Sequence, residues 1–200
     1  MKKITTFLIT TLCFAQFSCK DDFLTTTDPT RINSNLFYQN QTQFEQALNG
    51  VYGQLQTITN TAYLGQEFMS DNTTLDFNPL DRGGAAGWEA FELSTVNPGN
   101  GEIAALWNNH YAAMYNINYA LEKLAPSTID ATAKSAIEGQ LKFIRAFHYF
   151  NLVRYFGDVI LATKTLNNPN EAFDLVKSPQ AEVYKQIESD LKDAVNLLPT

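Results

Sequence analysis

The segment from 131 to 156 constrains the fold most, because it is a long run with apolar residues on two sides. Asp130 precedes it as a helix N-cap and Gly157 follows it as a stop, and the run is too long for a β-strand. At about 100° per residue, its apolar residues gather on two sides of a helix. One side carries Phe143, Ala146, Phe147, Phe150 and Val153, and the other carries Ile137, Leu141, Ile144, His148 and Leu152. We therefore expect a central helix covered by neighbours on both sides, as in a stack of helical hairpins.

Other amphipathic segments flank this central helix. A capping-box spacing of Thr42 and Glu45 opens a helix whose apolar stripe extends to Leu55. A shorter helix is predicted to begin at about Tyr63 and to end near Ser70 and Asp71. Apolar spacing predicts another helix over 102–124.

The last predicted helix opens with Ser178 as N-cap and Pro179 at the first helical position, and it ends at Pro199. Its apolar stripe is Tyr184, Ile187, Leu191, Ala194, Val195 and Leu198. No segment indicates a sheet, so the predicted fold class is all-α.

Residues 71–101 have the composition of a long loop. They hold Pro79, Pro98 and five of the ten glycines, together with the buried-type residues Trp88, Phe91 and Leu93. Because a long ordered loop in a compact domain is usually functional, this loop is the first place to expect a site. Its candidate ligand-binding residues are Asp71, Asn72, Asp76, Asn78, Asp81, Arg82 and Trp88.

These residue types suit sugar recognition, in which an aromatic ring receives the apolar face of the sugar and planar amide, carboxylate or guanidinium groups span its hydroxyls. Two other interpretations remain open. Trp88 would be a core plug that pins the loop while the aspartates form turns, or the carboxylates would be the acid and base of a glycosidase.

The first residues have the layout of a secretory signal. Lys2 and Lys3 form a positive head, an apolar stretch too short to span a membrane runs over 4–15, and Ser18 is a small residue just before Cys19. The segment resembles a bacterial lipoprotein signal in which Cys19 becomes the lipidated first residue, although Gln16 stands where such signals usually carry leucine. An ordinary secretion signal with an incidental cysteine is the alternative.

The residues after Cys19 predict an acidic export tag and a tether. Lys20, Asp21 and Asp22 resemble the tag that sends some lipoproteins to the outer face of the outer membrane, and are otherwise a solvated charge run. We expect residues 1–18 to be the signal peptide, 19–32 the lipidated N-terminus and tether, and 33–200 a helical domain.

Composition excludes several classes of protein. The formal net charge of −7 and the lack of a basic cluster argue against nucleic-acid binding. The only cysteines, Cys13 and Cys19, precede the body of the protein, so we expect neither a disulfide framework nor a thiolate metal site there. With only His110 and His148 available, we expect no metal site, and we expect a hydrogen-bonded core histidine at position 110. No cofactor is implied.

Asp190 lies at the edge of the apolar stripe of the last helix, where an unpaired carboxylate would be costly. We hypothesise that Arg145 or Arg154 neutralises it.

Several segments together carry a family likeness. Residues 141–161, LKFIRAFHYFNLVRYFGDVIL, resemble the signature helix and turn of the SusD/RagB family of surface nutrient-binding lipoproteins, and 183–199, VYKQIESDLKDAVNLLP, resemble its next helix. Further similarity lies at 22–24, at 47–52, and in Trp107, Tyr111 and Asn118. Ile160 departs from the family pattern, which has proline there, so the course of 158–178 is left open.

The resemblance implies an α-superhelical scaffold of tetratricopeptide-like helix pairs with a long ordered loop, of which 33–200 is only the N-terminal part. It also implies an oligosaccharide-binding or peptide-binding protein that is lipid-anchored in the outer membrane, faces the cell exterior and acts as the lid of a TonB-dependent, SusC-like barrel. No catalytic residue is implied, and ligand residues vary too much between members for any to be carried over. A helical protein-interaction adaptor without its own ligand is the alternative.

Overall fold

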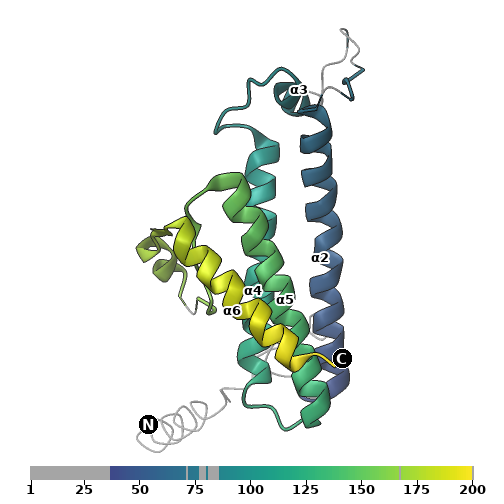
Figure 1. The fold of residues 1–200 in the computed structure, drawn as a ribbon, viewed down its shortest axis with the longest axis vertical. Coiled ribbons are helices and arrows are strands. Elements are labelled where there is room, and N and C mark those ends of the chain that lie inside the picture. Colours follow the sequence, from purple (N-terminus) through teal and green to yellow (C-terminus); the bar gives the residue numbers. More distant parts are fainter. Residues whose placement is uncertain (1–36, 71, 77–79, 81–85, 167, 200) are drawn as a thin grey trace, which may run out of the picture. The chain divides into compact units, whose positions relative to one another are not determined.

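The computed structural model describes residues 37–70, 72–76, 80, 86–166 and 168–199. The helices and strands named here all lie within the compact unit Tyr38–Thr200 (Figure 1). The elements are α2 (Gln41–Phe68), α3 (Ala86–Glu92), α4 (Gly101–Leu124), α5 (Ala131–Phe156), β1 (Val159–Ile160), the 3-10 helix η3 (Pro169–Asp174), β2 (Lys177–Ser178) and α6 (Gln180–Leu197). The all-α prediction is confirmed, with one short antiparallel β1–β2 pair that the sequence did not reveal.

Helix α5 begins and ends as predicted. The side chain of Asp130 accepts hydrogen bonds from the backbone N–H groups of Thr132 and Ala133, both at 3.0 Å. Gly157 ends the helix with φ of 70°, in the left-handed region that glycine adopts without strain.

The predicted start and division of α2 are wrong. Asn40 is the N-cap, and its side chain accepts from the N–H of Gln43 at 3.1 Å, so the capping box expected at Thr42 lies inside the helix instead. The helix is also continuous to Phe68, without the break expected before Tyr63. No proline interrupts 56–62, and Thr61 bonds back to the carbonyl of Thr57 at 3.2 Å, which keeps its hydroxyl satisfied within the helix.

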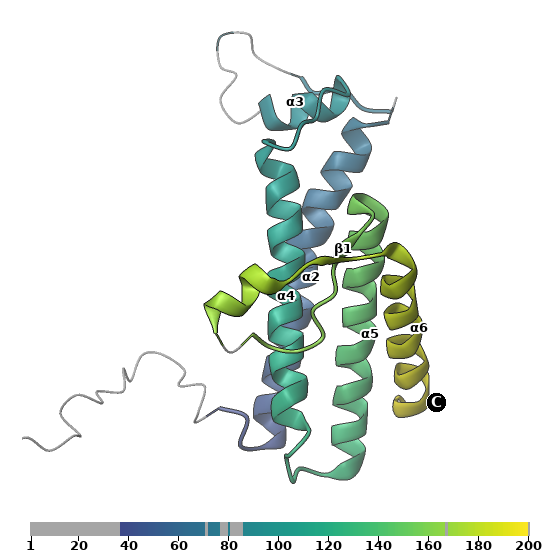
Figure 2. The same ribbon diagram turned by 90° about the vertical axis from the view of Figure 1, so that its left-hand side faces the viewer.

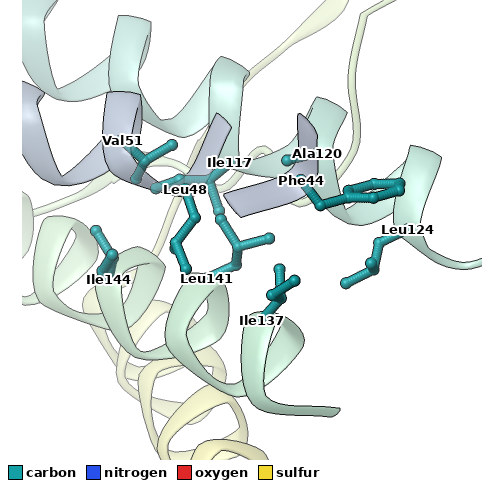
Figure 3. Close-up of a cluster of buried hydrophobic side chains, with 9 residues drawn as sticks. All are labelled: Phe44, Leu48, Val51, Ile117, Ala120, Leu124, Ile137, Leu141 and Ile144. Atoms are coloured by element: carbon teal, nitrogen blue, oxygen red, sulfur yellow. The ribbon is translucent and has the colours of Figure 1, made fainter. Parts of the chain in front are cut away.

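The main core lies between α2, α4 and α5. Its side chains come from the faces that the apolar spacing predicted, and each large aliphatic or aromatic side chain buried in this way contributes about 1.5–3 kcal/mol. The cluster consists of Phe44, Leu48 and Val51 of α2, Ile117, Ala120 and Leu124 of α4, and Ile137, Leu141 and Ile144 of α5 (Figure 3).

Helix α6 packs on α5, in the most extensive contact between any two elements of the described chain. Its buried face is Val183, Ile187, Asp190 and Ala194, which is rotated from the predicted stripe, because Tyr184, Leu191 and Val195 are exposed. The predicted Ser178 cap is also wrong. Ser178 pairs in β2, and the first N–H of α6, that of Gln180, donates instead to Asp158 at 3.1 Å.

The hypothesis that an arginine neutralises Asp190 is confirmed, and the arginine is Arg145. Its Nε and Nη2 donate to the two carboxylate oxygens at 2.8 and 2.7 Å, and both side chains are buried. Arg145 Nη1 also donates to Asn118 Oδ1 at 3.0 Å, and Gln186 donates to Asp190 at 3.0 Å. The buried charges are therefore both paired and hydrogen-bonded, as a buried ion pair requires.

The connection from α5 to α6 crosses over α4 (Figure 2). We call residues 159–165 of this connection the strap. Tyr111 donates to the carbonyl of Ile160 at 2.9 Å, and Tyr149 and Asn118 donate to the carbonyl of Ala162 at 2.7 and 2.9 Å. These hydrogen bonds hold the backbone of the strap in place, although position 160 is isoleucine and not the proline of the family pattern.

One side of α5 is not covered as predicted. Ile137, Leu141, Ile144, His148 and Leu152 are all buried, but on the other side only Ala146 and Val153 are. Phe143, Phe147 and Phe150 are 49%, 40% and 42% exposed.

Candidate functional site

The candidate site lies between the end of α2 and the start of α4. The predicted loop contains the short helix α3, which carries Trp88. Of the predicted site residues, the structure describes Asn72, Asp76 and Trp88. Asp71, Asn78, Asp81 and Arg82 lie outside the described residues.

Trp88 joins α3 to the end of α2. Its ring lies 6.0 Å from that of Phe68 and 5.7 Å from that of Phe91, and it is only half-buried. Phe91 is buried against Gly65, where an added Cβ would stand 3.3 Å from the Phe91 ring. Trp88 therefore pins the loop, as the core-plug interpretation expects, and its partial exposure leaves ring surface for a ligand.

Glu92, at the end of α3, holds the segment that precedes α3. Its carboxylate accepts from the hydroxyl of Thr74 at 2.6 Å and from the N–H of Leu75 at 3.0 Å. These hydrogen bonds, that of Thr74 first, lower the pKa of the Glu92 carboxyl. Thr73 adds a bond to the carbonyl of Glu67 at 2.7 Å. Residues 72–76 are thus tied to both α2 and the helix that carries Trp88.

Asn72 and Asp76 are exposed within this fastened segment. The backbone N–H of Asn72 donates to Ser70 Oγ at 3.3 Å. An exposed amide and an exposed carboxylate, on a segment that Glu92 fastens to the helix of Trp88, are groups that can recognise hydroxyls without any covalent step.

Asn100 connects α3 with α4, and sequence reasoning missed it. Its side-chain amide donates to the carbonyl of Gly87 at 2.9 Å, and its Oδ1 accepts from the N–H groups of Glu102 and Ile103 at 2.9 and 3.3 Å. The sequence signal was present, because asparagine is among the best N-caps and Gly101 begins the helix. Glu92 had no such signal, since its partners lie 17 and 18 residues away.

A hollow of about 320 Å³ adjoins the site. It lies between α2, α3, α4 and the end of α5, and its wall is mostly apolar. Gln66 donates to Tyr155 Oη at 3.0 Å on its wall, and Glu102 and Arg154 supply one charge of each sign.

The two histidines form a buried pair between α4 and α5. His110 Nδ1 and His148 Nδ1 are 3.0 Å apart, so one ring donates to the other, as expected for a hydrogen-bonded core histidine. Burial lowers the pKa of His110 to about 4, and burial together with the neighbouring His110 lowers that of His148 to about 3. Within the described part of the chain, no group of three or more His, Cys, Asp or Glu residues could hold a metal ion.

Cys19, Lys20, Asp21 and Asp22 lie outside the described residues, so lipidation and the export tag stay predictions. Among the helices that the structure describes, none is both long and apolar enough to cross a membrane.

These features define a scaffold of packed helices in which α3, with its half-buried Trp88, lies between α2 and α4. The family described as starch-binding and associating with the outer membrane matches residues 22–200, and the chain belongs to this SusD-like family.

Relatives of known name are similar over most of this chain. SusD-like protein P2 of Formosa agariphila is 28% identical over 170 residues, which is 82% of this chain and 32% of the relative. A SusD-like protein of Bacteroides fragilis superposes with a TM-score of 0.69 at 28% identity, over 86% of this chain and 31% of its own. A laminarin-binding SusD-like protein gives a TM-score of 0.70 at 28% identity, over 81% of this chain and 35% of its own. The chain thus spans about a third of the length of these proteins, and they share its helical, tetratricopeptide-like architecture.

Proposed function

We propose that this chain is the N-terminal part of a cell-surface lipoprotein that captures an oligosaccharide, or a peptide, for uptake. The observation that carries the proposal is the family match over residues 22–200, because the family's description joins starch binding with the outer membrane. A laminarin-binding relative of the same architecture supports a glycan as the ligand class.

The proposed anchor is a lipid on Cys19. Residues 1–18 are the leader, 19–32 the tether with its Lys20–Asp22 export tag, and 33–200 the helical domain. Each buried acyl methylene contributes about 0.8 kcal/mol, so several chains on one residue hold a domain at a bilayer without a spanning helix. Mass spectrometry of the mature protein tests this step: we expect an acylated Cys19 at the N-terminus, and an unmodified thiol there contradicts it.

The proposed ligand surface comprises the half-exposed ring of Trp88, together with Asn72 and Asp76 of the segment that Glu92 of α3 holds. Asp71, Asp81 and Arg82 complete the set as predicted from the sequence. The hydrogen bonds of Glu92 and Asn100 support this assignment, because they fix the segments before and after α3 in the free protein. Less conformational entropy of these segments is then lost when a ligand binds.

The proposed partner is a TonB-dependent barrel of the outer membrane, over which the protein acts as a lid. Capture and delivery need no covalent chemistry, and the Glu92 carboxylate of α3 has both oxygens engaged by Thr74 and Leu75.

Affinity electrophoresis through gels that contain single glycans, laminarin and starch first, tests capture. We expect retardation of the protein without release of shorter sugars. Retardation with cleavage would indicate a glycosidase instead. No retardation on any glycan, together with co-purification of a large membrane barrel, would indicate an adaptor that has no ligand of its own.

A further inference from the structure

One charged side chain of each sign lines the hollow between α2, α3, α4 and the end of α5. Glu102 is the second residue of α4 and is half-buried, whereas Arg154 lies in the last turn of α5 and is exposed. Each charge complements its helix end, because the start of a helix favours an anion and the last turn favours a cation. Two helices thus supply opposite charges to the wall of one hollow.

Neither of these two charges is paired. Among the residues that the structure describes, no ion pair and no side-chain hydrogen bond involves Glu102 or Arg154. The Arg154 guanidinium has only ring contacts, at 5.1 Å from the centroid of Phe150 and 5.9 Å from that of Tyr155. A ring gives the guanidinium N–H groups no oxygen acceptor, so these donors remain available for a carboxylate.

Gln66 and Tyr155 add neutral polar groups to the same wall. Gln66 Nε2 donates to Tyr155 Oη at 3.0 Å, and the proton of the Tyr155 hydroxyl is not used in this hydrogen bond. That proton can be donated to a carboxylate, and the side-chain oxygen of Gln66 can accept from an ammonium group. The wall therefore offers one charged and one neutral partner to a ligand group of either sign.

The rest of the wall is mostly apolar and comes from the elements around the hollow. Its larger apolar residues are Met69, Phe91, Val96, Ile103, Leu106 and Phe156. The volume of about 320 Å³ lies at the lower end of the range of about 300–1,000 Å³ that is usual for small-molecule sites. A sugar would bring hydroxyls against apolar side chains here, so the hollow fits a small ligand with an apolar body.

We propose that this hollow binds a small zwitterion with an apolar body, namely an apolar α-amino acid or a dipeptide of such residues. Its carboxylate pairs with Arg154 and accepts from Tyr155, and its ammonium group pairs with Glu102. A ligand with a single charge would leave one of the two protein charges without a partner in a partly desolvated hollow. The hollow shares no residue with the proposed glycan surface on Trp88, so the inference is independent of glycan capture.

An NMR chemical-shift titration of the unsubstituted protein tests the ligand class. The two zwitterions are leucine and leucyl-leucine, and the singly charged controls are N-acetyl-leucine, which lacks the ammonium group, and leucinamide, which lacks the carboxylate. We expect at least one zwitterion to bind about tenfold or more tightly than either control, because each control loses a charged partner. Binding of leucine alone or of leucyl-leucine alone supports the proposal and identifies the size of the ligand. No binding of either zwitterion, or equal binding of the controls, overturns it.

Two charge-removing variants test the assigned partners. Arg154→Gln should weaken binding of the zwitterion but not that of leucinamide, and Glu102→Gln should weaken binding of the zwitterion but not that of N-acetyl-leucine. The matched controls are Lys192→Gln and Glu188→Gln, which remove the same charges from an ion pair on α6 whose side chains are 74% and 68% exposed. These controls should bind like the unsubstituted protein. Unchanged binding in the first two variants, or an equal loss in the controls, overturns the proposal.

The crossed pattern separates contact with the ligand from a structural effect. A variant that merely disturbed the fold would weaken binding of every ligand in the series, whereas loss of one contact affects only the ligands that make it. Circular dichroism of each variant checks that its helix content is unchanged. If a variant failed to fold, the comparison of the zwitterions with their singly charged analogues on the unsubstituted protein would still decide the proposal.

Discussion

The two connections that cross the helical scaffold are fastened in different ways. The strap is held by side chains from the core itself, since Tyr149 and Asn118 are buried and the same Asn118 accepts from Arg145 of the buried ion pair. The segments around α3 are held by Glu92, Asn100 and Trp88, of which only Asn100 is buried.

Because the strap contacts are more buried than those around α3, the two regions are expected to contribute differently to stability and to ligand binding. Removing a strap contact leaves a buried polar group unsatisfied, which is costly, whereas removing a contact near α3 exposes the partner to water, which satisfies it. The strap end of the molecule is therefore expected to set the free energy of unfolding, and the α3 end to set ligand binding. Loops that carry function on a rigid scaffold follow the same division.

Asp190→Asn should give the largest effect on stability. It removes the charge that pairs with Arg145, and breaking a buried pair by changing one partner costs about 3–5 kcal/mol. Urea unfolding followed by circular dichroism measures the loss. The control is Asp193→Asn, because the Asp193 side chain is 47% exposed in its ion pair with Lys142, and an exposed pair contributes about 1 kcal/mol or less. Equal effects of the two variants would show that the buried pair does not set stability.

Acid should destabilise the strap end next. His110 and His148 directly precede the strap-holding Tyr111 and Tyr149, and their pKa values, about 4 and about 3, lie below the 6.5 of an ordinary histidine. As pH falls, the unfolded chain binds protons before the folded chain does, so the free energy of unfolding decreases. Below pH 6 the decrease approaches about 1.4 kcal/mol per pH unit for each histidine.

Urea unfolding between pH 7 and 5.5, above the range where carboxylates dominate, measures this slope. The His110→Phe, His148→Phe double variant keeps two aromatic rings and should lose most of the slope. If the free energy of unfolding of the double variant still fell with pH as steeply as that of the wild type, groups other than these histidines would cause the pH dependence.

Trp88→Ala should separate the two ends of the molecule. It removes two aromatic contacts, each worth about 0.5–1.5 kcal/mol, so stability should fall by less than in Asp190→Asn. Retardation by the glycan that the wild type binds should nevertheless disappear. Tyr115→Ala is the control, since it removes an exposed ring on α4, and it should leave retardation unchanged. If the Trp88→Ala variant were still retarded by the glycan, Trp88 would have only the structural role of packing the loop against α2.

Local sequence patterns predicted most of the scaffold, because helix ends and apolar spacing are local. Asp130 and Gly157 bound α5 as expected, and the partner of Asp190 was among the two arginines proposed. The main error concerned Phe147 and its neighbours: spacing shows that a face is apolar, but it does not show whether another element within the chain covers it.

The candidate site was harder to predict, because its geometry comes from contacts between distant residues. Trp88 was identified by its residue type, yet its exposure depends on Phe68 and Phe91. The role of Glu92 depends on Thr74 and Leu75, which no local pattern connects with it. The ligand-binding role of the whole predicted set remains a prediction, and Asp81 and Arg82 lie outside the described residues.

Glu92→Ala should have the smallest effect on stability and the most local one. The variant removes both acceptors that hold Thr74 and Leu75, but water can replace them because this loop is exposed. The urea midpoint should therefore stay unchanged, while the amide proton of Leu75 exchanges faster in hydrogen–deuterium exchange. Glu92→Gln, which keeps one acceptor oxygen, should give an intermediate rate. If the midpoint instead fell as far as in Asp190→Asn, the α3 end would be as much a part of the folding unit as the strap, and the division between a stabilising end and a recognising end would not hold.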